Sequence, residues 1–174
     1  MSEATLHGLV PADLRRVLSQ PLPATLPHDP HAPLGVRTFE ILCFSQKDFT
    51  TPTPELGPDY TCLFTTVARI GGVAFFGDGF IQVALAQGPA SLVGKGDDVW
   101  HRDGPDGSYK RAVVCDMFGT LYGPPSGRRK RPAPDYGILV FDGHAYHAAQ
   151  LGPRGITKTR LQVSYYPRRP GLIA

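Results

Sequence analysis

After Gly71, the hydrophobic and polar positions form short runs that glycines and prolines separate. Several runs alternate apolar and polar residues, the period-2 pattern of a strand with one buried face. Runs this short and this regularly interrupted are typical of a sandwich or barrel, and not of alternating strands and helices. The predicted strands are Val73–Phe76, Gly79–Ala86, Ala90–Val93, Asp98–Asp103, Lys110–Leu121, Gly137–Phe141 and Thr157–Tyr166.

The residues before this region follow a different pattern. Val10–Gln20 predicts a short helix, because a proline suits its first turn and Pro21 ends the pattern. Val36–Phe44 has the composition of a strand, whereas Tyr60–Ile70 fits either a strand or a buried helix. The N-terminal part is therefore expected to be helical and irregular.

Length and composition agree with one folded unit. The chain has 174 residues, of which 41% are hydrophobic, enough for one sizeable core. The net charge of +3 is too small to indicate a polyanionic partner by itself. We expect a single domain over residues 1–174, mainly β, with a support region at 1–70 and a β core at 71–168.

The chain shows no apolar run of membrane-spanning length and no signal-peptide core. Its three cysteines, Cys43, Cys62 and Cys115, are odd in number and unevenly spaced, which argues against a disulfide framework. We expect a cytoplasmic protein without a membrane partner. The basic run Arg128–Arg131 lies in the predicted exposed loop Pro124–Pro134, and is either a solvated tip or a contact for a phosphate, a carrier protein or nucleic acid.

Candidate metal ligands come from two places. In an extended strand His101 and Asp103 point to the same face and offer an imidazole and a carboxylate, although an isolated pair fits a surface strand equally well. His144 and His147 follow an apolar strand and a tight turn. Either histidine is a candidate third ligand, and the alternative is that both only pack.

The predicted strand Thr157–Tyr166 has one polar face, made of Lys158, Arg160, Gln162 and Ser164. Cations inside a small barrel are costly unless an anion pairs with them. A guanidinium suits a carboxylate well, because its fork binds both oxygens. This face is therefore either an anion site or a solvated surface.

These parts together have the composition of a non-haem iron centre. Two histidines and one carboxylate on one side of Fe(II) leave the other positions free for a chelating co-substrate and O₂. A cation on a neighbouring strand is then suited to hold the far carboxylate of that co-substrate.

The order of the motifs resembles the 2-oxoglutarate/Fe(II)-dependent oxygenase superfamily. WHRDG is similar to its proximal motif, through His101 and Asp103. LVFDGHAYHA is similar to its distal segment, where the metal histidine stands four residues after the glycine, and this implies His147 with His144 as the alternative ligand. The same segment is similar to phytanoyl-CoA hydroxylase-like and thymine or 5-methylcytosine oxygenase-like members.

TRLQVSYY is similar to the co-substrate strand of the superfamily. The resemblance implies that Arg160 binds the carboxylate, with Lys158 second, Arg154 a further possibility and Gln162 beside them. It also implies the fold, a double-stranded β-helix of the jelly-roll, cupin-like kind, and the cofactors: Fe(II), 2-oxoglutarate and O₂. Because halogenating relatives replace the carboxylate that Asp103 retains, hydroxylation, desaturation or cyclisation is expected. The small size of the chain favours a small-molecule substrate.

Three alternatives stay open. The first is a nucleobase or nucleic-acid oxygenase of the same superfamily, which the small and only modestly basic chain does not favour. The second is a cupin-like metalloenzyme that does not use 2-oxoglutarate. The third is a non-catalytic binding module on the same barrel. The substrate and the oligomeric state are not indicated by the sequence.

Overall fold

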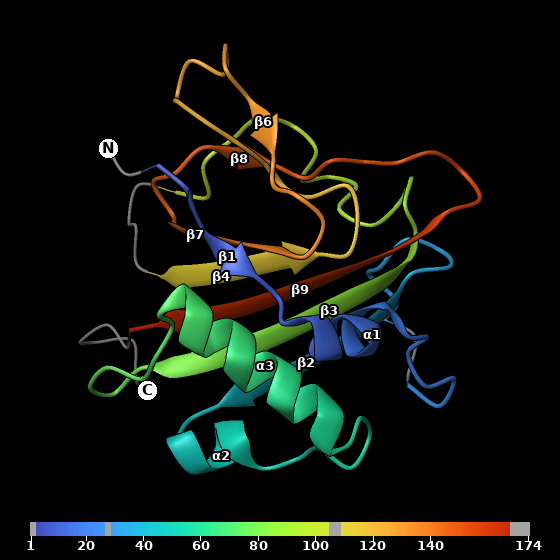
Figure 1. Ribbon diagram of the computed structural model, residues 1–174, viewed down its shortest axis with the longest axis vertical. Coiled ribbons are helices and arrows are strands. Elements are labelled where there is room, and N and C mark those ends of the chain that lie inside the picture. Colours follow the sequence, from blue (N-terminus) through green and yellow to red (C-terminus); the bar gives the residue numbers. More distant parts are fainter. Residues whose placement is uncertain (1–2, 27–28, 105–108, 168–174) are drawn as a thin grey trace.

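The structure is a computed structural model and describes residues 3–26, 29–104 and 109–167 (Figure 1). In chain order its elements are β1 (Thr5–Leu9), α1 (Ala12–Ser19), β2 (Arg37–Cys43), α2 (Gln46–Thr50), α3 (Pro58–Gly71), β3 (Phe80–Pro89), β4 (Lys110–Cys115), β5 (Leu121–Tyr122), β6 (Arg131–Pro132), β7 (Gly137–Asp142), β8 (His147–Ala148) and β9 (Thr157–Tyr166).

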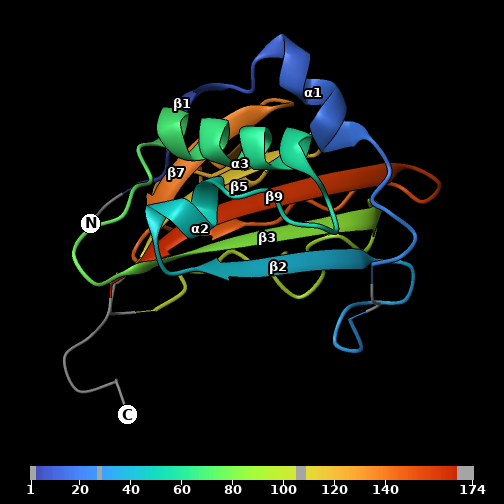
Figure 2. The ribbon, with the colours of Figure 1, turned by 90° about the horizontal axis from the view of Figure 1, so that it is seen from below.

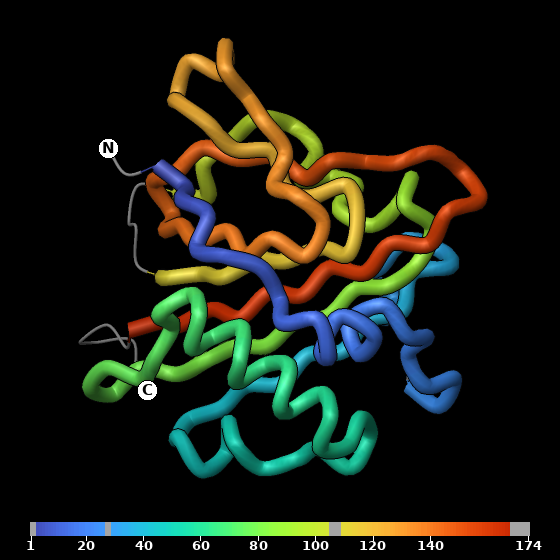
Figure 3. Tube along the Cα trace, viewed as in Figure 1, coloured from blue at the N-terminus to red at the C-terminus, as the bar shows by residue number. Residues whose placement is uncertain are grey.

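Two antiparallel sheets build the molecule. The larger has six strands in the order β1-β7-β4-β9-β3-β2, and the smaller has three in the order β6-β5-β8. The longest pairing joins β3 to β9, from Phe80 opposite Tyr166 to Pro89 opposite Thr157. The trace in Figure 3 shows β1, near the N-terminus, beside β7 from the last third of the chain. Neighbours in the larger sheet therefore come from distant parts of the sequence.

Helices cover one face of the larger sheet (Figure 2). The main core lies between α1, α2 and α3 and the strands behind them, and includes Leu18, Leu63, Ile81, Leu161 and Val163. A second apolar cluster lies between the two sheets, where Val113, Leu139 and Phe141 of the larger sheet pack with Tyr122 of β5 and Ala145. The smaller sheet therefore rests on the β4 and β7 side of the larger one.

The segment that fitted either a strand or a helix is the helix α3. Pro58 stands in its first turn, and Gly72 ends it with a left-handed φ of 66°. The helix presses closely on the sheet at its last residue: a Cβ on Gly71 would lie 2.9 Å from Cβ of Ala112 in β4. A strand is excluded because the buried positions, such as Leu63 and Val67, follow the helical period.

Three predicted strands are wrong. Val73–Phe76 is irregular, and Ala90–Val93 is a turn in which the Val93 amide donates to the Pro89 carbonyl. Asp98–Asp103 contributes only an isolated bridge at His101. Their buried apolar residues pack against neighbours without pairing into a sheet, which a short apolar run cannot reveal.

Other boundaries also differ from expectation. Lys110–Leu121 divides into β4 and β5, and β1 and α2 were not predicted. The strand at 36–44 and the helix at 10–20 are confirmed within two residues by β2 and α1, and β9 has the predicted bounds. Across residues 3–26, 29–104 and 109–167, none of the helices is both long and apolar enough to traverse a bilayer.

Candidate metal centre

A two-residue bridge brings the two candidate histidine ligands together. The His101 amide donates to the His147 carbonyl at 3.1 Å, and the His147 amide donates to the His101 carbonyl at 2.9 Å. Residues paired in this way across an antiparallel bridge have neighbouring side chains on one face. The imidazole centroids are accordingly 4.6 Å apart.

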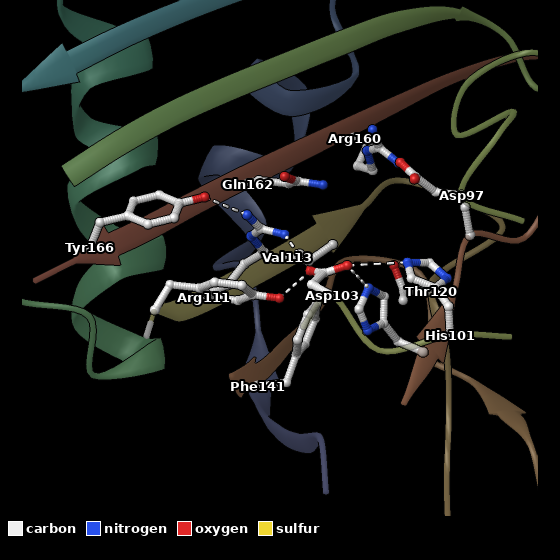
Figure 4. A pocket seen from close by; sticks show the side chains of 13 residues that line it. Asp97, His101, Asp103, Arg111, Val113, Thr120, Phe141, Arg160, Gln162 and Tyr166 are labelled. Atoms are coloured by element: carbon white, nitrogen blue, oxygen red, sulfur yellow. Dashed lines mark hydrogen bonds and ion pairs between the residues drawn. The ribbon is translucent and has the colours of Figure 1, made fainter. Parts of the chain in front are cut away.

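Asp103 completes the group from a bend just after the bridge. Its Oδ1 lies 3.2 Å from Nε2 of His101 and 3.6 Å from Nε2 of His147 (Figure 4). One ligand atom from each residue fits within a 4.8 Å span. Neighbouring ligands bound at about 2.1 Å to one octahedral ion lie about 3 Å apart, so these three need only small shifts to share an ion.

Both imidazoles face the group with the nitrogen that can bind a metal. Nδ1 of His147 lies 3.1 Å from the Ala145 carbonyl, and Nδ1 of His101 lies 2.5 Å from the Val99 carbonyl. Because a carbonyl only accepts, each Nδ1 carries a proton, and Nε2 is the nitrogen left to bind a metal. Such outer hydrogen bonds are typical of ligating histidines.

Burial and charge favour the ligating forms of His147 and Asp103. Burial lowers the pKa of His147, and the Ala145 carbonyl and Asp103 offset this only in part. Burial by itself raises the pKa of Asp103, but the hydrogen bond from Tyr109 and the charges of His147, Arg111 and His101 outweigh it and hold that pKa below its usual range. A neutral imidazole and an ionised carboxylate are therefore available near neutral pH.

The group opens into a cavity of about 380 Å³ between the sheets. Two residues of the polar face of β9, Arg160 and Gln162, also line it (Figure 4). Among the described residues, no hydrogen bond or ion pair to the Arg160 guanidinium is found. The cavity thus combines a His-Asp-His group with a cation whose donors are available.

The other predicted site residues lie elsewhere. Lys158 is buried, and its Nζ donates to the Gln150 carbonyl at 2.8 Å, so it does not border the cavity. Arg154 is exposed outside the cavity. His144 is also outside the group, because the turn that begins at Asp142 directs His147 inward instead, with the His144 amide bound to Asp142 Oδ1 at 2.9 Å.

Several cavity residues were missed by sequence reasoning. Arg111 and Tyr109 are two residues apart where β4 begins, and this period-2 spacing of polar groups beside the apolar Ala112–Cys115 was the available signal. The others come from loops or from the end of β9, and no local pattern marks them. The missed lining residues are Asp97, Tyr109, Arg111, Thr120 and Tyr166.

Half of the basic run is held against aromatic rings. Nζ of Lys130 lies 5.4 Å from the centroid of Trp100, and Cζ of Arg131 lies 4.8 Å from that of Tyr122. Arg128 and Arg129 are exposed. The loop is exposed over most of its length, as predicted, and its β6 strand pairs with β5.

The geometry defines a facial His-Asp-His group on a double antiparallel sheet. The sequence matches no protein-family model, and no curated protein matches it either. Solved structures do match. A prolyl-4-hydroxylase from Pseudomonas putida aligns over 96% of this chain and 92% of its own, at 15% identity and a TM-score of 0.52.

Two further structures agree. A dioxygenase for auxin oxidation from rice aligns over 92% of this chain and 65% of its own, at 14% identity and a TM-score of 0.50. An oxidoreductase of the 2OG-Fe(II) oxygenase family from Burkholderia pseudomallei aligns over 94% and 84%, at 18% identity and a TM-score of 0.50. The chain therefore has the double-stranded β-helix fold, and the predicted resemblance is confirmed for the fold and the presence of the triad.

Proposed function

We propose that this protein is a non-haem oxygenase that depends on Fe(II) and 2-oxoglutarate. It hydroxylates a small molecule, or desaturates or cyclises it, and converts 2-oxoglutarate to succinate and CO₂. One observation carries the proposal: the triad and the available Arg160 guanidinium border the same cavity of about 380 Å³.

Each residue has a defined part. His101, Asp103 and His147 hold the iron, because two imidazoles and one carboxylate on one side are the donor set of this metal class. When bound, Fe(II) would offer the coordination positions that 2-oxoglutarate chelates and would supply the activation of O₂. Arg160 binds the far carboxylate of the co-substrate with its fork of donors, and Gln162 provides a neutral polar neighbour on the same strand face.

The size of the cavity supports a small substrate, or one small group of a larger molecule. Ligand pockets span about 300–1,000 Å³, so this cavity is near the lower limit. Bound 2-oxoglutarate would occupy part of this volume and leave less for the substrate. Phe141, Val113 and Tyr166 give it apolar walls beside the metal ligands. These walls orient a reacting C–H group and exclude water.

The test is an anaerobic titration of the purified protein with Fe(II), with and without 2-oxoglutarate, followed by visible absorption. We expect a weak charge-transfer band only when both are present, and its loss in Asp103→Ala. Iron binding without any response to 2-oxoglutarate would instead favour a cupin-like metalloenzyme. A protein that binds neither would be a binding module.

The matched functional assay is release of succinate from 2-oxoglutarate under air, which needs no knowledge of the substrate. Slow release that requires added Fe(II) supports the proposal, and Asp103→Ala gives the background. Candidate small molecules are then screened for acceleration of this release.

A further inference from the structure

We propose that Arg111 is a positioning residue that orients the Asp103 carboxylate so that a single oxygen faces the metal. The inference rests on the proposed function only in so far as the triad binds a metal. It assigns a role to a residue outside the motifs, on a different strand.

The two oxygens of Asp103 have different surroundings. Oδ1 faces Nε2 of both histidines, at 3.2 and 3.6 Å. Oδ2 accepts hydrogen bonds from the Tyr109 hydroxyl and from Nη1 of Arg111, the latter at 3.2 Å. Turning the carboxylate to present Oδ2 as well would break both of these bonds. The arrangement therefore selects binding through one oxygen.

Arg111 is itself held at every nitrogen. Nε donates to Ser164 Oγ at 2.8 Å, and Nη2 donates to the Tyr166 hydroxyl at 2.7 Å. The guanidinium also lies over the Tyr109 ring, 4.3 Å from its centroid, and the side chain is only 13% exposed. Three of its five N–H donors are used in this way, so Arg111 is fixed in orientation where it borders the cavity.

The location of Asp103 explains why its carboxylate needs the support of Arg111. Asp103 lies in a bend and has no strand pairing, whereas Arg111 lies in β4, which is paired with β7 on one side and β9 on the other. Arg111 stands opposite Ser164 in that register. The position of a loop carboxylate is thus set from the centre of the larger sheet, and outer partners of metal ligands typically contribute about 10–100-fold in affinity.

Co(II) binding, followed by its visible bands, tests the inference, because the bands report coordination as well as affinity. Arg111→Met keeps an unbranched apolar stem and removes all three bonds. Arg102→Met is the matched control. Arg102 is exposed between His101 and Asp103, and its substitution also removes one positive charge close to the triad. Loss of a cation alone would strengthen Co(II) binding, whereas loss of positioning weakens it.

We expect Arg111→Met to bind Co(II) about 10–100-fold more weakly with shifted bands, and Arg102→Met to bind as well as the wild type or slightly better. Arg111→Lys keeps the charge but not the three bonds, and should remain weakened. Tyr166→Phe removes one support of Arg111 and serves as a milder variant if Arg111→Met does not fold, with a few-fold loss expected.

Unchanged or tighter Co(II) binding by Arg111→Met, with the bands of the wild type, would overturn the inference and leave the proposed function standing. A wild-type protein that binds Co(II) but never responds to 2-oxoglutarate would overturn the proposed function and leave the role of Arg111 intact.

Discussion

Replacing either of two cations on the same face of β9 by methionine should affect 2-oxoglutarate binding very differently. Arg160 borders the cavity beside the His-Asp-His group, and its guanidinium has no hydrogen bond or ion pair among the described residues. Lys158, two residues earlier, is 1% exposed and is bound to the Gln150 carbonyl. We therefore expect Arg160→Met to weaken 2-oxoglutarate binding and Lys158→Met to leave it nearly unchanged.

The size of the effect follows from the hydrogen bonds at stake. A guanidinium fork makes two charge-assisted hydrogen bonds to a carboxylate, each worth about 1.5–3 kcal/mol. Their loss, about 3–6 kcal/mol, corresponds to roughly 10²–10⁴-fold weaker binding of 2-oxoglutarate. Lys158→Met removes no group from the cavity, so the affinity of this variant for 2-oxoglutarate should stay within about threefold of the wild type.

Lys158→Met should instead affect stability. Burial lowers the pKa of Lys158 in the folded protein, because the ammonium is removed from water. The buried charge therefore destabilises the fold at all pH values below that lowered pKa. This cost decreases as the pH rises from the pKa of Lys158 in the folded protein to its pKa in the unfolded chain. Since methionine has a similar length, the variant should be as stable as the wild type or more so at pH 7, with the difference shrinking at pH 10.

Both variants are titrated anaerobically with 2-oxoglutarate after loading with Fe(II), and urea denaturation at the two pH values measures stability. Iron affinity is the internal control, because neither side chain belongs to the triad. The reasoning fails if Lys158→Met loses 2-oxoglutarate while Arg160→Met keeps it. In that case the anchor is Lys158, and its contact with the Gln150 carbonyl is exchanged for the co-substrate.

Two further predictions concern histidines and thiols. His147→Ala should bind Fe(II) at least about 100-fold more weakly than the wild type, while His144→Ala binds normally, as measured by competition with a metal-sensitive dye; the reverse result would reassign the ligand. Of the three free cysteines only Cys62 is exposed, and burial together with Asp48 raises the pKa of Cys43 to about 11. A thiol reagent at pH 8 should therefore modify one cysteine rapidly in the native protein, with Cys43 and Cys115 reacting only after denaturation. Rapid modification of two or three would contradict the packing.

Local patterns were sufficient where a clear alternation was present. Thr157–Tyr166 was predicted with its observed bounds, because the alternation of polar and apolar residues from Arg160 to Tyr165 defines a strand with one polar face. The short strands β5, β6 and β8 have two residues each, which is too short for any period to be visible. They exist because of their pairing with one another, which the pattern of two residues cannot indicate.

The same distinction applies to the site. His101 and Asp103 were predicted to share a strand face, and they do share one group, but through a bridge to His147 and a bend. The contact of Arg111 with Asp103 depends on the register of β4 against β9, where Arg111 stands opposite Ser164. Register is a property of two strands, so neither segment alone indicates it.

The bridge between His101 and His147 ties the two imidazoles to a single opening event. Each of these residues donates its amide to the carbonyl of the other, so separation of the pair disrupts both positions at once. The two imidazoles should therefore leave the site together and not one after the other. A metal ion that binds only when the bridge is closed stabilises the closed bridge by about 2.7 kcal/mol at a metal concentration 100 times its Kd. In hydrogen-exchange experiments that report the open population, the two amides should therefore share one protection factor, and metal at that concentration should raise the protection factor of both about 100-fold.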